Sequence, residues 1–164
     1  MKFIEKFRAY VAEPVLASLF LSILSQTFSF RSLADFTHSE ARDALALFLV
    51  LLGAAFALWI GLFWVSNTDF GAWLAERGEL EAINDTYIYT VVAFLAAGLA
   101  CLPSAFLSVD HVEFHGMVLW LQLFALCCVP SMLTNTRSLL RLHSVFNQRS
   151  QKIKTFPARA ENSH

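Results

Sequence analysis

The stretch Ala44–Val65, which reads ALALFLVLLGAAFALWIGLFWV, decides the fold of this 164-residue chain. It lies in a run of 25 residues, between Asp43 and Asp69, that contains no Asp, Glu, Lys or Arg. The hydrocarbon core of a bilayer is about 30 Å thick, so a helix needs about 20 apolar residues to cross it. The stretch is therefore predicted to be a transmembrane helix.

Three further charge-free stretches have similar lengths. They run between Glu13 and Arg31, between Asp85 and Asp110, and between Glu113 and Arg137. Hydrophobic residues make up 57% of the chain and charged residues 15%, whereas a soluble domain carries about 25% charged residues. We therefore expect an all-α polytopic membrane protein, and because the connections are short, a four-helix bundle with up-down-up-down topology. The predicted spans are residues 11–30, 44–65, 86–108 and 116–136.

The distribution of basic residues predicts the orientation of the spans. Of the 12 Lys and Arg residues, 10 fall in the N-terminal segment, the second loop and the C-terminal tail, and 2 fall in the first loop. The positive-inside rule then places both termini in the cytoplasm, as expected for a bacterial inner-membrane protein. Around the membrane domain, residues 11–136, we expect an amphipathic lead-in over residues 1–10 and a basic tail over 137–164. The tail is expected to be helical to about residue 148 and disordered at its end.

Small residues recur at four-residue spacing on two predicted spans. One ridge contains Gly53, Ala57 and Gly61, and another contains Ala93 and Ala97. Small side chains let helix backbones approach closely and gain dispersion contacts in lipid. The two ridges can therefore pack on each other within one protomer, or one of them can face a second copy of the chain. In the fourth span, Pro130 predicts a kink near Leu126.

A stripe of polar residues runs along one face of the first predicted span. Its members lie within about a quarter-turn of one helix face, and Gln122 adds an amide in the fourth span. Because lipid offers no hydrogen-bond partners, the stripe is expected to form a helix–helix contact or to line a hydrated path in an oligomer. The residues of this possible polar path are Ser18, Ser22, Ser25, Gln26, Ser29 and Gln122.

Histidines gather in the two loops at the outer face. His111 and His115 are four residues apart, a spacing that can hold a divalent metal, and His38 lies in the first loop. Histidines can also respond to pH. The third ligand is not defined and the order is not the zincin His-Glu-x-x-His pattern, so solvated rim residues are the favoured interpretation. No metal and no other cofactor is predicted.

The second loop and the tail carry opposite charges. The loop is acidic, the tail is basic, and a short helix over Thr68–Arg77, ended by Gly78, is expected to lie along the membrane interface. An acidic surface is repelled by the anionic inner leaflet and suits a basic partner. That partner is either another protein or this chain's own tail. The residues predicted to dock a partner are Asp69, Trp73, Glu76, Glu79, Glu81, Arg137, Arg141 and Arg149.

The segment Gln26–Ala57 resembles the small four-helix subunit of tripartite periplasmic transporters. The similar features are Gln26 and Arg31, the entry Ser39-Glu40-Ala41-Arg42, and Gly53-Ala54-Ala55. The resemblance covers about a fifth of the chain. It stops short of membership, because that family carries a basic, histidine-containing segment after its second span, where this chain has Trp64-Val65-Ser66-Asn67-Thr68-Asp69. The resemblance implies a small transporter subunit with a large membrane partner.

Several functional classes are disfavoured by what the spans lack. No acid or base falls in mid-membrane, which argues against proton relays and ion-coupled carriers. No nucleophile triad, paired aspartates, phosphate-binding loop or haem-attachment motif is present. The sequence therefore predicts a non-enzymatic, self-associating membrane subunit that anchors or signals to a cytoplasmic or membrane protein, such as the membrane arm of a bacterial defence or toxin-immunity system. The alternatives are an oligomeric pore with the serine stripe facing water and the transporter subunit. No nucleic-acid partner is expected.

Overall fold

The structure is a computed structural model that describes residues 2–106 and 111–155, with side chains for 11–29, 31–106 and 111–151. In these residues the chain forms six α-helices and no strand. In chain order, the helices are α1 (Lys2–Thr27), α2 (Phe30–Ser39), α3 (Ala41–Ser66), α4 (Asp69–Glu76), α5 (Glu79–Phe106) and α6 (Val112–Thr155). The all-α prediction is confirmed for the described residues.

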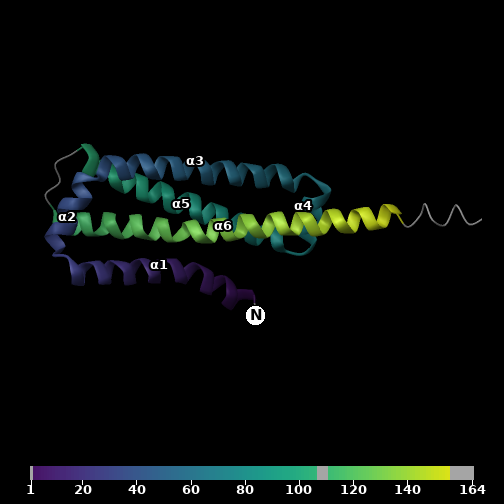
Figure 1. Cartoon of the computed structure of the whole chain (residues 1–164), viewed down its shortest axis with the longest axis horizontal. Helices are drawn as coiled ribbons and strands as arrows, with labels where there is room; N and C mark the ends of the chain where they lie inside the picture. The colour runs from purple at the N-terminus through teal and green to yellow at the C-terminus, as the bar shows by residue number, and fades with distance from the viewer. Residues whose placement is uncertain (1, 107–110, 156–164) are drawn as a thin grey trace, which may run out of the picture.

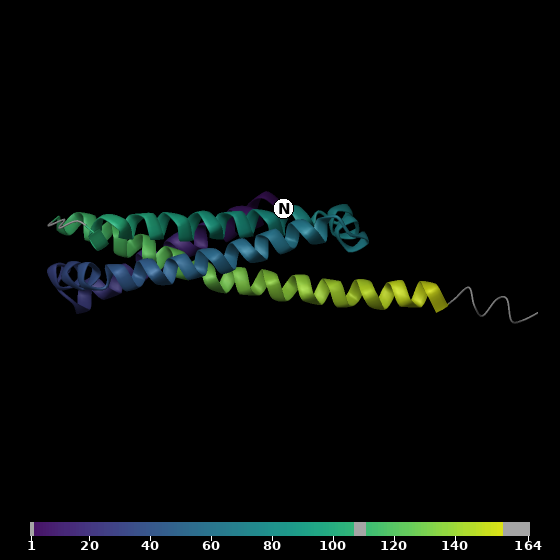
Figure 2. The same cartoon turned by 90° about the horizontal axis from the view of Figure 1, so that it is seen from above.

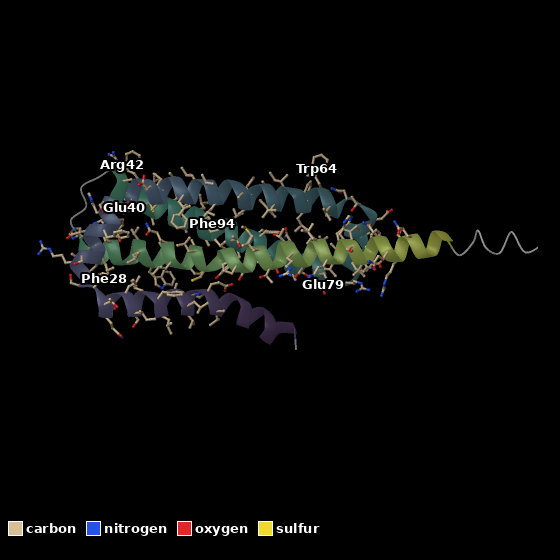
Figure 3. The ribbon with its side chains drawn as sticks, viewed as in Figure 1. Phe28, Glu40, Arg42, Trp64, Glu79 and Phe94 are labelled. Carbon is tan, nitrogen blue, oxygen red and sulfur yellow. The ribbon has the colours of Figure 1, made fainter. Side chains whose placement is uncertain are left out.

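The helices α3, α5 and α6 form the core of the molecule and are each long and apolar enough to cross a membrane. They lie side by side with neighbours reversed in direction (Figure 1). On α3, the buried positions recur every seven residues, at Ala41, Phe48, Ala55 and Leu62. This spacing puts them in one line along the face that packs on α5. Phe94 of α5 is fully buried and points into this contact (Figure 3).

Helix α1 packs mainly on α6, on the side away from α3 (Figure 1). Residues Val11–Thr27 of α1 reach the length and composition of a membrane span only together with Arg31–Ser39, and the two segments are bent by 114°. The described residues therefore hold three candidate spans, or four if this bent pair counts as one. The expected lead-in over residues 1–10 is continuous with α1 from Lys2 onward.

Helix α2 corrects the prediction of an irregular outer loop after the first span. Ser29 begins the helix as its N-cap, with its side chain accepting a hydrogen bond from the Ser32 amide. Its buried residues are Ala34 and Thr37, which lie on one face, and the helix crosses the end of the bundle beside α6 (Figure 1). The predicted first span, residues 11–30, thus ends at Thr27. We call this end of the bundle the α2 end.

The opposite end of the bundle, the α4 end, contains the short helix that the sequence predicts. Thr68 caps α4 by accepting a hydrogen bond from the Gly71 amide, and Gly78 follows the helix with a φ of 70°. A Cβ on Gly71 would collide with the backbone of Val65 and Ser66, so only glycine allows α4 to fold back this tightly on α3. The predicted short helix is therefore confirmed.

Helix α6 is 44 residues long and continues past the other helices at the α4 end (Figure 2). It includes Pro130, and the helix runs through this residue as one element. The helix runs beyond the fourth predicted span and ends at Thr155, later than the expected end near residue 148. The predicted disordered end, residues 156–164, lies outside the described residues.

Candidate functional site

The acidic loop and the basic tail meet at the α4 end through aromatic rings. The ring of Phe70 on α4 lies 4.9 Å from that of His143 and 5.5 Å from that of Phe146, both on α6. Trp73 adds a contact with Phe146 at 5.7 Å, and the Arg77 guanidinium lies 4.2 Å above the Trp73 ring. Such ring and cation–π contacts are each worth about 0.5–1.5 kcal/mol beyond their buried area. They fix α4 against the extension of α6.

The charged residues predicted to dock a partner lie around this aromatic contact and remain exposed. Glu79 is seen at the α4 end in Figure 3. Trp73 is half-buried because its ring packs on α6. The structure therefore brings the acidic loop and the beginning of the basic tail to the same end of the bundle. The exposed members of the set are Asp69, Glu76, Glu79, Glu81, Arg137, Arg141 and Arg149.

The two small-residue ridges have different environments. On α5, Ala93 and Ala97 are 2% and 0% exposed and belong to the core. On α3, Gly53, Ala57 and Gly61 are all exposed, and a Cβ added at either glycine would meet no atom within 4 Å in the described part of the chain. We call these three residues the α3 ridge. The possibility that the two ridges pack on each other within one protomer is therefore wrong.

The serine stripe also faces away from the bundle. Ser18, Ser22, Ser25, Gln26 and Ser29 are all exposed on α1 and at its end. Ser18 reaches across to α6, where its Oγ accepts a 3.1 Å hydrogen bond from Trp120 Nε1.

The remaining hydroxyls of the stripe bond locally where the structure describes them. Ser25 donates to the Ser22 carbonyl at 2.8 Å, and Ser29 caps α2. Gln122 lies elsewhere, between α6 and α5, and donates to Cys101 Sγ at 3.2 Å. The stripe and Gln122 therefore form no common path inside one protomer.

Two of the three outer histidines come together at the α2 end. The rings of His38 on α2 and His115 on α6 are 5.7 Å apart in an edge-to-face arrangement. His115 is 4% exposed, and its Nδ1 lies 3.5 Å from Ser104 Oγ on α5. His111 is exposed. Within the described ranges, no group of three His, Cys, Asp or Glu side chains is arranged to hold a metal ion.

Glu13 is the polar residue whose role the sequence does not reveal. Its side chain is 7% exposed and lies between α1 and α6, where its Oε1 accepts a 2.6 Å hydrogen bond from Ser131 Oγ. Its Oε2 is buried and has no hydrogen-bond partner among the side chains described, those of residues 11–29, 31–106 and 111–151. The sequence places Glu13 at the border of the first span, which hides its position inside the helix contact. The sequence feature that could have revealed the burial of Glu13 is its four-residue spacing to Ala17 and Leu21. Those two residues lie on the same α6-facing side of α1.

Glu13 lies inside the α1–α6 contact, near the start of the predicted first span. Ser131 is five residues before Thr136, whose Oγ1 is 2.8 Å from the Tyr87 hydroxyl. At 1.5 Å per residue, Ser131 therefore lies about 8 Å from this Tyr87–Thr136 contact along the axis of α6.

An apolar groove of about 470 Å³ runs from Glu13 along the α1–α6 contact. Its walls are formed by both helices, and Glu13 and Ser131 lie at one end of it. None of the lining residues that the structure describes is basic. The groove is lined by Ala12, Glu13, Leu16, Phe20, Leu123, Leu126, Cys127, Pro130 and Ser131.

A second groove, of about 550 Å³, lies at the α4 end between α3 and α5. Trp59 and Asn84 line it and are joined by a 2.9 Å hydrogen bond from the indole Nε1 to the amide Oδ1. This bond ties α3 to α5 next to the loop that carries α4.

Comparison of the chain with protein-family models, with curated proteins and with solved structures finds no match.

Proposed function

We propose that this protein is a non-enzymatic membrane subunit that self-associates through the α3 ridge and docks a protein partner at its α4 end. The observation that carries the proposal is the open α3 ridge. At 100° per residue, Gly53, Ala57 and Gly61 lie opposite the α3 face that packs on α5. A ridge of small residues on the outer side of a membrane helix favours close approach of another helix.

A second copy of the same chain is the simplest occupant of this ridge. In a two-fold dimer the same surface is used by both partners, so one self-complementary ridge is sufficient. Val50 and Trp64 flank the ridge and are 70% and 72% exposed, so they are available to pack across such an interface. Trp64 projects outward from α3 in Figure 3.

The α4 end supplies the surface for the partner. Four exposed carboxylates surround α4, and exposed arginines follow on the α6 extension. The aromatic contacts of Phe70 and Trp73 hold these charges in a fixed arrangement. Charges placed on rigid elements favour specific association and fast encounter with a partner of complementary charge. The count of basic residues on the two faces supports a cytoplasmic location of this end in a bacterial inner membrane.

Site-directed cross-linking tests the proposed interface in the native membrane. Ala57 is at the centre of the ridge, so Ala57→Cys places two thiols close together across a two-fold axis. We expect an oxidised covalent dimer for this variant. The matched control is Phe63→Cys, because Phe63 is 70% exposed on α3 but points away from the ridge. Equal cross-linking of the two variants, or none for Ala57→Cys, would count against the interface.

The oligomeric pore remains a second candidate, and one observation favours it. The serine stripe is exposed on α1, so an oligomer could arrange several copies of it around water. In planar bilayers, Ser22→Leu and Ser25→Leu would then abolish a conductance that the unmodified protein shows. Absence of any conductance from the unmodified protein would remove this candidate.

A further inference from the structure

The groove between α1 and α6 has the chemistry of a binding site for an amphiphile with a positively charged head. Glu13 is only 7% exposed, and its Oε2 has no donor within the described part of the chain. A buried carboxylate oxygen without a donor costs several kcal/mol unless a partner supplies one. Among the residues whose side chains the structure describes, those that line the groove include no Lys, Arg or His.

The order of residues along the groove matches the direction of a membrane lipid. Glu13 and Ser131 lie toward the α4 end, and Phe20 and Leu123 lie toward the middle of the bundle. Leu123 and Ser131 are eight residues apart, so the apolar part extends about 12 Å along α6. A lipid of the leaflet at the α4 end has the same polarity, with its head near that surface and its chains pointing inward.

The groove is also open to the hydrocarbon along its length. Leu16, Phe20 and Leu126 line it and are 46%, 48% and 42% exposed. A volume of about 470 Å³ falls within the range of ordinary ligand pockets. An acyl chain can therefore enter from the side, without passing between packed helices.

We propose that this groove binds an aminophospholipid whose primary ammonium donates a hydrogen bond to Glu13 Oε2 and whose acyl chain lies against Leu16, Phe20, Leu123 and Leu126. Ser131 holds the carboxylate in place through its bond to Oε1. Because Oε2 is buried, side chains at this end of the groove move aside when the headgroup binds. The bound lipid then packs between α1 and α6 and fixes the angle between these two helices.

Glu13 Oε2 needs a hydrogen-bond donor, and a primary ammonium headgroup supplies one. A choline headgroup carries the same positive charge but has no N–H, so it cannot satisfy Oε2. Hydrogen bonds to charged groups contribute about 1.5–3 kcal/mol, and 1.4 kcal/mol corresponds to a tenfold change in affinity. The expected preference for ethanolamine over choline lipid is therefore about tenfold or more.

Native mass spectrometry of the full chain, released from vesicles with equal amounts of ethanolamine, choline and glycerol phospholipids, measures this preference. We expect one ethanolamine lipid retained per chain, about tenfold over choline lipid. In Glu13→Gln the preference should fall to about one. Glu113→Gln is the matched control, because Glu113 is an exposed carboxylate near the other end of α6, and it should keep the preference.

A headgroup series on the unmodified protein tests the proposal without any substitution. Ethanolamine, N-methyl and N,N-dimethyl lipids all carry an N–H, and choline lipid does not. Retention that persists through the series and falls at choline supports the hydrogen bond to Glu13. Displacement of the bound lipid by a free long-chain primary amine supports the same chemistry. Equal retention of all headgroups, preference for the anionic glycerol lipid, or an ethanolamine preference that survives in folded Glu13→Gln would overturn the proposal.

Discussion

Glu13 on α1 and Ser131 on α6 are joined by a 2.6 Å hydrogen bond across the peripheral helix contact of the bundle. The bond joins residues that are 118 positions apart, and the second carboxylate oxygen has no partner in the part of the chain that the structure describes. Because α1 packs mainly on α6, this polar contact and the Trp120–Ser18 bond are its main described polar ties to the rest of the molecule.

Ser131→Ala should loosen α1. The substitution removes the donor to Glu13 Oε1, so that neither oxygen of this buried carboxylate keeps a partner among the described residues, at a cost of about 1–3 kcal/mol. Hydrogen exchange of the α1 amides, followed by mass spectrometry in lipid nanodiscs, should become faster while exchange in α3 and α5 is unchanged. Ser138→Ala is the control, because Ser138 is exposed on the same helix. Unchanged exchange in α1 would show that the bond contributes nothing to its packing.

Gly71→Ala should displace α4 from the end of α3. The added Cβ collides with the backbone of Val65 and Ser66, and backbone atoms cannot move aside as a flexible side chain can. Overpacking of this kind costs about 1–3 kcal/mol. Brief trypsin treatment should then cut after Arg77 faster than in the unmodified protein. Ala72→Ser changes an exposed neighbour on the same helix and should leave the rate of cleavage unchanged.

Tyr87 and Thr136 should show energetic coupling between α5 and α6. Tyr87 is 1% exposed, and its hydroxyl lies 2.8 Å from Thr136 Oγ1. A double-mutant cycle of Tyr87→Phe and Thr136→Val, measured as thermal stability in nanodiscs, should give a coupling free energy of about 0.5–1.5 kcal/mol. A coupling near zero would mean that water or lipid satisfies both hydroxyls equally well.

The two ends of the bundle should be accessible from opposite sides of the membrane. Ser32→Cys on α2 and Ser144→Cys on the α6 extension both put an exposed thiol outside the apolar core. In intact bacterial cells, a membrane-impermeant maleimide should label Ser32→Cys, and Ser144→Cys should react only after the membrane is opened. The unmodified protein, with Cys101, Cys127 and Cys128 at buried or half-buried positions, provides the background. Labelling of both variants in intact cells would contradict the expected orientation.

The long helices could be predicted because charge-free length is a property of the chain itself. The short helix α4 could also be predicted, from Thr68 as a cap and Gly78 as a stop. Helix α2 could not, since ten residues of mixed polarity between two spans are equally compatible with an irregular loop. The mixed polarity of these ten residues indicates a helix only when the packing of α2 on α6 is known.

The surfaces of the helices were harder to predict than their existence. The ridges on α3 and α5 have the same spacing of small residues, and only the packing shows that the α5 ridge is inside and the α3 ridge is outside. The burial of Glu13 was equally hard to predict. A glutamate beside Pro14 at the edge of an apolar run is typical of a membrane border, and its burial depends on a partner in α6.

The most direct test of self-association is the mass of the full chain extracted from its membrane in native-lipid nanodiscs and measured by native mass spectrometry. The account predicts a multiple of the 18.4 kDa chain mass. It also predicts that Gly53→Leu with Gly61→Leu reduces this to a single copy, while Ser22→Leu, which adds similar bulk to the exposed face of α1, leaves it unchanged. A single copy for the unmodified protein, or an oligomer that survives both glycine substitutions, would contradict it.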